Sequence, residues 1–356
     1  MFGILELSQR MTRLKIKTVQ KVLIGMIVVL GIGTTTGNSV GAVGSGSLPV
    51  LPSQFHVHDV NVPANSSGET IQAAINSASI AGGGTVTLEK GKYSIKKPIY
   101  LKRNVTITGA GKGATVLQID ANLGANGALT SNNSNPAVNV IIKNLTVDGV
   151  AAAEPDKALN HDEITNYGIL LDGNSYVNDK VLFDNIEIKN TNMGLHMKGS
   201  SNVTVQNSEF HDNGGSINFW HNIYLRRVTK VLIENCDIYK SNSGNGINIS
   251  YSDHVTVDSS KIHDNHFRGI RVAVSSFVDV TNNNVYGNKT GDGIIFNSEK
   301  TGVTNFRIIK NAVSDNGGYG ININGACSNG EVISNISGEG NKNGYIQNGG
   351  ENVSVK

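Results

Sequence analysis

The sequence predicts a stacked β-solenoid, an all-β fold in which each turn of the chain adds one rung. The first observation is a phrase of a small residue, Ile or Leu, any residue and an apolar residue, repeated at intervals of 23 to 28 residues. Its clearest copies begin at Gly168, Gly194, Asn222, Gly246, Gly269, Gly293, Gly320 and Gly344. Repeats of this length are typical of solenoids. The second observation is composition, because 42 glycines and 6 prolines in 356 residues suit short strands and turns.

The N-terminal segment has the layout of a secretory signal peptide, predicted over residues 1–42. Basic residues precede an apolar run from Val22, and a small-residue cleavage site follows at Ala42. Translation could begin at Met1 or at Met11, and an uncleaved membrane anchor is the alternative interpretation. We expect a Gly/Ser/Pro linker over 43–62 and a single repeat domain over 63–356, because each coil of a solenoid buries its face on its neighbours.

Removal of the leader changes the charge of the chain. Residues 1–42 hold five Lys or Arg and one Glu, a net +4, so a whole-chain charge of +2 becomes −2 in the mature protein. A net acidic chain gives no support to a nucleic-acid partner. The sequence therefore predicts a secreted, extracellular protein with no membrane partner after cleavage and an undetermined oligomeric state.

The predicted domain opens with a helix and several short strands. Ile71, Ala74 and Ile75 fall on one helical face, the pattern of an amphipathic helix that could cover the open end of a solenoid. The segments 82–88 and 105–113 follow, reading GGGTVTL and VTITGAGKG. The last glycines look like a phosphate-binding loop, but no helical pattern follows them, so we interpret them as a tight turn.

This opening resembles the capping helix and first coils of the pectate-lyase-type, or pectin lyase-like, superfamily. The resemblance implies a single-stranded right-handed parallel β-helix with a short N-terminal capping helix. Such motifs specify the fold well and the activity poorly. Members of the superfamily typically act on acidic polysaccharides, so the resemblance also implies a secreted polysaccharide-active protein.

Turn positions and cysteines are given structural interpretations. Asn stacks at one turn position of successive coils, where its amide can satisfy turn backbone. The residues at that position are Asn213, Asn242, Asn265, Asn288 and Asn316. The His-Asp-Asn triplets that begin at His211 and His263 are interpreted as turn residues for the same reason. Cys236 and Cys327 lie four coils apart, or about 19 Å at ~4.8 Å per strand, so we expect both to be free and buried.

No metal-ligand spacing is present in the repeats, and we predict no metal in the site and no cofactor. One insertion, 151–166, interrupts the period and carries Asp156, Asp162 and Glu163. Insertions in solenoids often lie on the binding face. Ca²⁺ could bind only if this loop folded over the site.

The repeat places variable residues in outward columns on one sheet. Alternate residues of a strand face opposite sides, so the Ile and the second apolar residue of each phrase point inward and their neighbours outward. The outward residues of four central coils form what we call the basic column: His196, Lys198, His221, Tyr224, Arg226, Asn245, Asn248, Arg268 and Arg271. No acidic residue of these four coils lies in the columns. We therefore expect the cations of the basic column to have no neutralising partners.

For any single member of the basic column, ordinary surface exposure is the simpler explanation. The set is harder to explain in that way, because clustered like charges repel one another. We interpret the cluster as the binding site of an anionic ligand that supplies the missing charge. Trp220, next to His221, is a candidate for stacking on a sugar.

The residue types indicate β-elimination at a uronic acid. That reaction needs a cation on the carboxylate, a base for the C5 proton and an acid for the departing O4. We assign Arg226 and Arg271 to the carboxylate and Tyr224 to the acid. The base is His221 or His196, with Lys198 as an alternative. Substrate binding is assigned to Arg268, Asn248, Asn245 and Trp220.

The predicted function is therefore a polysaccharide lyase acting on a uronate-containing polymer, with three alternatives left open. The same groups could return the proton to the opposite face, as a mannuronan-type C5-epimerase does, although the Tyr-Gly-Phe-Asp-Pro-His motif of that type is absent. A glycoside hydrolase needs two carboxylates about 5–9.5 Å apart, and only Asp212 and Asp264 approach that spacing. A surface protein could also hold acidic glycan without catalysis.

Overall fold

The computed structural model describes residues 49–52, 58–149, 166–215 and 219–356, which belong to one compact unit spanning Gly46–Lys356. The predicted leader over 1–42 lies outside the described residues. Part of the expected linker is already structured, because β1 (Val60–Val62) pairs in parallel with Val86–Leu88 of the first coil. Within the described residues, no helix has the length and apolarity needed to cross a membrane.

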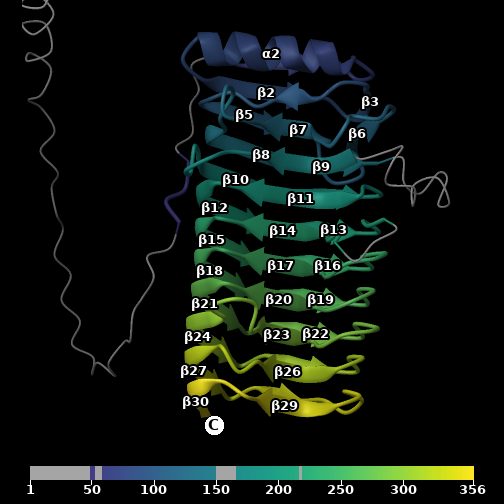
Figure 1. Cartoon of the computed structure of the whole chain (residues 1–356). Coiled ribbons are helices and arrows are strands. Elements are labelled where there is room, and N and C mark those ends of the chain that lie inside the picture. The colour runs from purple at the N-terminus through teal and green to yellow at the C-terminus, as the bar shows by residue number, and fades with distance from the viewer. Residues whose placement is uncertain (1–48, 53–57, 150–165, 216–218) are drawn as a thin grey trace, which may run out of the picture. The chain divides into compact units, whose positions relative to one another are not determined.

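One face of the solenoid is a ten-stranded parallel sheet that contains all eight copies of the repeated phrase. Figure 1 shows its strands stacked from the capped end toward the C-terminus. In spatial order they are β4 (Ile99–Tyr100), β7 (Asn126–Ser131), β9 (Asn166–Leu171), β11 (Met193–Lys198), β14 (Ile223–Arg226), β17 (Ile247–Ser250), β20 (Ile270–Ala273), β23 (Ile294–Asn297), β26 (Tyr319–Ile323) and β29 (Gly344–Asn348).

The remaining strands form two further faces, which are joined because the long strands β8 (Val138–Asp148) and β10 (Asn178–Lys189) run through both. One face continues through β2 (Gly84–Leu88), β5 (Val105–Thr108), β12 (Ser200–Gln206), β15 (Thr229–Glu234), β18 (Asp253–Asp258), β21 (Ser275–Thr281), β24 (Val303–Ile309), β27 (Ser328–Ile333) and β30 (Glu351–Val355). The other holds β3 (Gly91–Ile95), β6 (Thr115–Ile119), β13 (Glu209–His211), β16 (Asp237–Tyr239), β19 (Lys261–His263), β22 (Asn284–Tyr286), β25 (Ala312–Ser314) and β28 (Ile336–Ser337).

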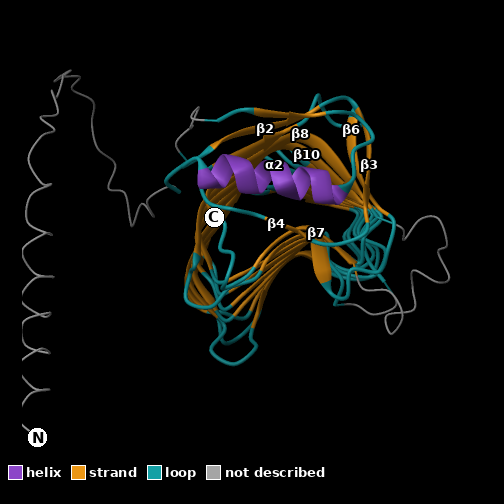
Figure 2. Cartoon of the chain, turned by 90° about the horizontal axis from the view of Figure 1, so that it is seen from above, coloured by secondary structure: helices purple, strands orange, loops and turns teal. Residues whose placement is uncertain are grey.

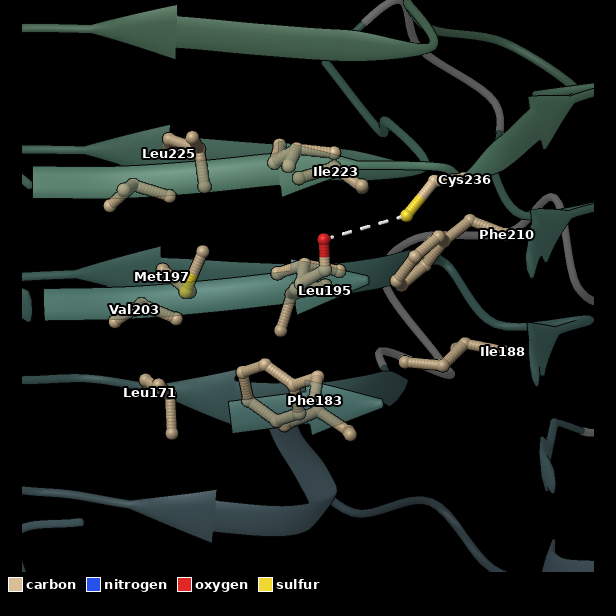
Figure 3. Packing of buried hydrophobic residues seen from close by; sticks show 14 of the residues in the cluster. Leu171, Phe183, Ile188, Leu195, Met197, Val203, Phe210, Ile223, Leu225 and Cys236 are labelled. Carbon is tan, nitrogen blue, oxygen red and sulfur yellow. Dashed lines mark hydrogen bonds between the residues drawn. The ribbon is translucent and has the colours of Figure 1, made fainter. Parts of the chain in front are cut away.

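The core is built from columns of identical positions. The Ile or Leu of each phrase stacks on its equivalent in the next coil, as Leu195 on Ile223 and Ile223 on Ile247. These side chains are fully buried, and burial of each stabilises the fold by about 1.5–3 kcal/mol. Figure 3 shows the packing of several such residues and the Cys236 thiol donating to the Val205 carbonyl oxygen at 3.6 Å.

Helix α2 (Gly68–Ile80) covers one end of the solenoid, as predicted from its apolar face (Figures 1 and 2). Ser67 caps it by accepting a hydrogen bond from the Thr70 backbone N–H. Ile71, Ala74 and Ile75 are buried against the first coil. The helix thereby removes the open sheet edge that would otherwise invite pairing with another chain.

An asparagine ladder runs through the turns and explains why the repeated phrase begins with glycine. Asn265 Nδ2 donates to Asn288 Oδ1 at 3.0 Å, and Asn288 Nδ2 donates to Asn316 Oδ1 at 2.8 Å. A Cβ at Gly269 would lie 2.9 Å from Asn288 Nδ2 in its own coil. The same Cβ would lie 2.5 Å from the Gly293 carbonyl oxygen and 2.6 Å from Val285 Cγ1, so the ladder and these two neighbours together leave room only for glycine.

One predicted member of this ladder is wrong. Asn242 is displaced by one position, its side chain donates to the Asp212 carbonyl oxygen, and Ser241 takes its place in the turn. Asn222 fills the gap from the opposite side of the coil, linking Asn213 and Asn265 through bonds of 2.9 and 3.0 Å. Asn222 can occupy a position that is otherwise glycine because Ser241 leaves the space free.

The cysteine prediction is confirmed, since Cys236 and Cys327 are both free and buried. Burial raises the pKa of the Cys236 thiol to about 12, which keeps it protonated. Both thiols donate to main-chain carbonyls of the core. They are structural groups with no access to substrate.

Candidate active site

The basic column exists in the register that the repeat predicts. His196 pairs with Tyr224 on the next rung, Tyr224 with Asn248, and Asn248 with Arg271. Lys198 pairs with Arg226 in the parallel column one step along. The side chains therefore stack along the solenoid axis at the strand spacing of about 4.8 Å.

Several of these outward side chains are buried rather than exposed. His221 is 4% exposed, Asn245 2% and Asn248 5%. His196, Tyr224, Arg226, Arg268 and Arg271 are half-buried. Close stacking of large side chains on successive rungs covers the smaller ones between them. Ordinary surface exposure therefore does not account for the column.

His196 lies at the centre of an aromatic cluster. Its ring centroid is 5.4 Å from that of Tyr167 and 5.0 Å from that of Tyr224. Among the described residues, neither Nδ1 nor Nε2 has a hydrogen-bond partner, although both atoms are buried. The pKa of His196 is lowered to about 4, chiefly by burial, with Asp172 opposing the shift and Lys198 and Arg226 adding to it. The ring is therefore neutral near pH 7, with one N–H donor and one acceptor nitrogen that no described residue engages.

His221 has a different character, although the sequence offers it as an equal candidate for the base. Its Nδ1 accepts the backbone N–H of Asn245 at 3.0 Å. A backbone N–H can only donate, so the proton of the neutral ring is on Nε2. Burial, followed by Arg271, lowers the pKa of His221 to about 3. His221 is therefore a neutral N–H donor toward the column rather than a proton acceptor.

Tyr224 is oriented by two donors. Its Oη accepts from Arg226 Nη1 and from Ser250 Oγ, each at 3.4 Å. Because both contacts use the lone pairs of the phenol, its own proton is free to point elsewhere. The ring contacts His196 and also meets His221 edge-on at 5.7 Å. The Tyr224 ring thus lies beside the neutral imidazole of His196.

The expectation that the cations lack neutralising partners is wrong for two of them. Lys198 Nζ lies 3.0 Å from Asp172 Oδ1, and Arg271 Nη2 lies 2.7 Å from Glu299 Oε2. Asp172 comes from the adjoining coil and Glu299 from a loop after β23. Both partners therefore lie outside the outward strand positions of the four central coils, where the repeat places the cations.

Two further cations, Arg226 on a rung between these ion pairs and Arg268 in the same coil as Arg271, form no ion pair with a carboxylate of the described residues, although the charges of Glu299 and Asp292 act on them from farther away. The Arg226 guanidinium lies 5.0 Å from the centroid of the Tyr251 ring, and that of Arg268 lies 3.8 Å from the Phe267 ring. Arg268 Nε is buried without a hydrogen-bond partner in the described structure. Stacking on an aromatic ring orients a guanidinium without neutralising it. Arg226 and Arg268 are therefore available for an anion.

Residues outside the predicted set complete the cluster. Tyr167, from β9, contacts both His196 and Trp220, the latter at a centroid distance of 5.7 Å. It occupies the same column as His221, so extending the column by one coil would have found it. Trp220 thus packs into the aromatic cluster. Burial, followed by the charge of Asp172, raises the pKa of Tyr167, which keeps its phenol protonated.

The two acids proposed for a hydrolase are engaged elsewhere. Asp212 and Asp264 occupy left-handed turn positions with φ of 52° and 53°. Their carboxylates contact His211 Nδ1 at 2.6 Å and His263 Nδ1 at 2.7 Å. They end strands β13 and β19, on a different face from the basic column. This placement supports their interpretation as turn residues.

One group of described side chains has the composition of a metal site: Glu187, Glu209 and His211. The two carboxylates already lie near ammonium groups, since Lys189 is 3.0 Å from Glu187 and Lys112 is 3.6 Å from Glu209. These cations supply the charge that a metal would otherwise provide. The insertion considered for Ca²⁺ lies outside the described residues, apart from Asn166.

A protein-family model identifies the family of this fold. The model of the family described as "Right handed beta helix region" matches residues 126–307 and 217–356. The chain belongs to this right-handed β-helix family. The predicted right-handed parallel β-helix of the pectin lyase-like type is thereby confirmed.

Two curated relatives of this β-helix protein come from Azotobacter vinelandii. Alginate lyase 7 is 30% identical over 160 residues, which cover 41% of this chain and 18% of the relative. Mannuronan C5-epimerase AlgE3 is 30% identical over 182 residues, which cover 45% of this chain and 9% of the relative. Most of each relative therefore lies outside the matched segment.

Two solved structures share the β-helix architecture. The A-module of mannuronan C-5 epimerase AlgE6 from Azotobacter vinelandii matches with a TM-score of 0.57 and 19% identity, covering 84% of this chain and all of that module. Alginate lyase from Paenibacillus sp. str. FPU-7 matches with a TM-score of 0.56 and 16% identity, covering 82% and 99% of the two chains. At these identities the likeness concerns the fold alone.

Proposed function

We propose that the protein is a polysaccharide lyase that cleaves a uronate-containing polymer, with alginate as the first candidate substrate. The observation that carries the proposal is the buried, neutral His196, with two unpartnered ring nitrogens, beside the proton of Tyr224. The relatives named for alginate lysis and mannuronan epimerisation support the same substrate class.

In the proposed reaction the Arg226 guanidinium binds the carboxylate of one uronate. Arg226 is chosen because it has no carboxylate partner among the described residues and lies 3.4 Å from Tyr224 Oη. Its charge stabilises the carboxylate as electron density moves onto it from C5. Arg268 and Asn248 bind neighbouring sugars along the column.

His196 then removes the proton from C5. The electron pair of that C–H bond forms the C4–C5 double bond, and the C4–O4 bond breaks. Tyr224 donates its proton to the departing O4, which becomes the hydroxyl of the other fragment. The products are a chain with a 4,5-unsaturated uronate end and a shortened chain, with no water consumed.

A mannuronan-type epimerase is the second candidate, because the relative AlgE3 carries that name. Lyase and epimerase share the removal of the C5 proton by a base and the cation on the carboxylate. They differ in whether O4 leaves or a proton returns to the opposite face of C5. Tyr167 lies on the other side of His196 from Tyr224 in the stack and could return that proton.

The extracellular location is part of the proposal and rests on the predicted leader. Expression of the full chain in a secreting host, with N-terminal sequencing of the released protein, tests it. A mature N-terminus near Val43 is expected. Retention of the full chain in the membrane fraction would favour the anchor instead.

The reaction is tested by incubating the purified protein with polymannuronate, polyguluronate, polygalacturonate and a glucuronan. Ultraviolet absorbance reports the unsaturated uronate, and proton NMR of the recovered polymer reports inversion at C5. Absorbance growth on one polymer is expected. Inversion without absorbance would establish the epimerase. Asp212→Asn is the matched control and should retain activity, whereas a hydrolase using that acid would lose it. New reducing ends without absorbance would contradict the proposal.

A further inference from the structure

The connection between β23 and β24 is longer than its equivalents in the three preceding coils. It spans residues 298–302, whereas the corresponding turns are 227–228 after β14, 251–252 after β17 and Val274 alone after β20. Insertions in solenoids are concentrated at binding faces. This loop lies at the edge of the ten-stranded sheet that carries the basic column.

The loop reaches back over the column instead of packing only on its own coil. Glu299 Oε2 contacts Arg271 Nη2 at 2.7 Å, one rung earlier, and Lys300 Nζ lies 5.0 Å from the Tyr251 ring, two rungs earlier. The loop is closed by a turn in which Gly302 N–H donates to the Glu299 carbonyl at 3.0 Å, and Gly302 has a left-handed φ of 68°. Two charged side chains of one short insertion therefore contact the candidate site.

The two sides of the Glu299–Arg271 pair differ in how firmly they are held. The Arg271 side chain is 17% exposed and donates to Asn248 Oδ1 at 3.3 Å, whereas the Glu299 side chain is 48% exposed. A half-exposed ion pair contributes little to stability because water screens it and the side chain must be ordered. Arg271 thus keeps its place when Glu299 leaves, and another carboxylate can take over the contact.

The charges along the column support this exchange. Internal carboxylates occur at its two ends, Asp172 on Lys198 and Glu299 on Arg271. Arg226, on a rung between them, and Arg268, in the coil of Arg271, form no ion pair with a carboxylate of the described residues. The protein's own carboxylates therefore contact Lys198 and Arg271, two cations that could otherwise contact the carboxylates of a uronate chain.

We propose that Glu299 occupies a carboxylate subsite of the groove, and that a uronate carboxylate of the bound polymer displaces it from Arg271. This inference rests on the proposed uronate substrate and adds a specificity-determining residue to it. A neutral sugar at this rung offers Arg271 no carboxylate, so it leaves the Glu299–Arg271 pair in place and gains nothing there. An anionic sugar replaces the pair with its own carboxylate, so the subsite favours uronates over neutral sugars.

The test is calorimetric titration of mannuronate, guluronate, galacturonate and glucuronate oligomers, and of the same oligomers with their carboxyl groups reduced to alcohols. The protein carries His196→Gln to prevent turnover. With Glu299→Gln added, uronate oligomers should bind about two- to fivefold more tightly, the effect of removing one exposed competing ion pair. The reduced oligomers should show no such gain.

Two comparisons make the result specific. In the Arg271→Gln background, Glu299→Gln should give no tightening, because its partner is gone. Asp279→Asn, which breaks the pair of Asp279 with Arg307 on another face, should leave uronate binding unchanged. Unchanged or weaker binding of every uronate oligomer to the Glu299→Gln variant overturns the inference.

The inference and the proposed reaction can fail separately. The Glu299→Gln variant could bind uronates more tightly while the wild-type protein forms neither unsaturated nor epimerised product. That result would contradict the proposed reaction and support the proposed subsite. Turnover by the wild-type protein, without tighter uronate binding by the Glu299→Gln variant, would contradict the proposed subsite and support the proposed reaction.

Discussion

The rings of His211 and Tyr239 stack on neighbouring rungs, 4.8 Å apart and 3° from parallel. The stack continues from Tyr239 to His263 at 5.1 Å and from His263 to Tyr286 at 4.7 Å. Each imidazole also contacts a carboxylate at both nitrogens: Nε2 of His211 meets Glu187 at 3.1 Å and Nε2 of His263 meets Asp237 at 2.9 Å, in addition to the Nδ1 contacts. Two carboxylate acceptors favour two N–H donors, so these contacts stabilise the imidazolium form and raise the pKa of both rings against the opposing effect of burial.

This stack predicts a loss of stability at alkaline pH. Burial alone would lower the pKa of His211, but hydrogen bonds to Glu187 and Asp212 outweigh it and the pKa is raised. A raised folded-state pKa stabilises the protein fully below the ordinary value of about 6.5, and this contribution is lost as pH rises through the raised pKa. The melting temperature, measured across pH, should fall in that window.

His211→Phe tests the ion pairs separately from the stack, because it keeps a ring and removes both donors. It should lower the free energy of unfolding near neutral pH by about 2–3 kcal/mol and flatten the alkaline decline. His254→Phe is the matched control, since His254 stacks on Phe277, has one carboxylate contact, to Asp253, among the described residues, and is 33% exposed against 11% for His211. The His254→Phe change should lower the free energy of unfolding by less than about 1 kcal/mol. Equal losses in the two variants would assign the stabilisation to stacking.

A second prediction concerns the acid limb of the pH–rate profile. If neutral His196 is the base, kcat/KM should fall only as pH drops toward its lowered pKa of about 4. An ordinary imidazole base would produce this fall near 6.5. His196→Gln should remove the activity while polymer binding is retained. An acid limb near 6.5 would mean that another group accepts the proton.

A third prediction concerns Tyr224. Replacement by Phe keeps the ring contact with His196 and removes the proton assigned to O4, so kcat should fall by about 10²–10⁴-fold with little change in affinity. Tyr239→Phe, on the His/Tyr stack, is the control and should leave kcat unchanged. A small loss of kcat in the Tyr224→Phe variant would transfer the acid role to Tyr167.

The fold and the register of the site follow from periodicity alone. Once Leu195 and Ile223 are placed inward, His196 and Tyr224 must face outward on adjacent rungs, and they do. The same reasoning applied to the third strand of each coil would have found the stack of His211, Tyr239 and His263, which occupy equivalent positions in β13, β16 and β19. The His-Asp-Asn triplets alone suggest only turn residues, because the stack becomes visible when the rungs are aligned.

Contacts that leave the repeat were not predictable in this way. The period places a residue on a rung but does not say how far an insertion folds back, so Glu299 could not be assigned to Arg271. It also does not give hydrogen-bond direction, which separates His196 from His221. Asn222, and not Asn242, belongs to the ladder because one turn is shifted by one residue. The pattern of apolar residues does not reveal such a shift.

The ladder exchange gives a fourth prediction. Asn222→Gly restores the repeated phrase but leaves Asn213 and Asn265 each without one buried bond, which should cost about 1–3 kcal/mol. Adding Ser241→Asn places an amide in the turn, as in the neighbouring coils, and should recover most of this loss. Denaturant unfolding of the single and double variants measures both effects. Failure of the second change to rescue the first would mean that this turn cannot accept the ladder geometry.

A fifth prediction concerns backbone strain in the turn before β21. Val274 has a φ of 50°, an unfavourable conformation for a β-branched residue. Val274→Asn should therefore raise the free energy of unfolding by about 1 kcal/mol. Arg227→Asn, at the equivalent turn with a φ of 52°, lacks the branched Cβ and should change stability less. An unchanged or lower melting temperature for Val274→Asn would show that packing of the valine compensates for its conformation.

The asparagine ladder and the isoleucine columns have one property in common: every rung offers its two neighbours nearly the same partners. Removing one coil, such as 246–268, would bring Asn222 and Gly269 into the relationship that Gly246 and Gly269 have now, and duplicating it would repeat that relationship once more. Length can therefore change by whole coils while the interior is conserved. A protein built in this way can evolve a longer or shorter binding surface by duplication of genetic segments, without first acquiring a new core.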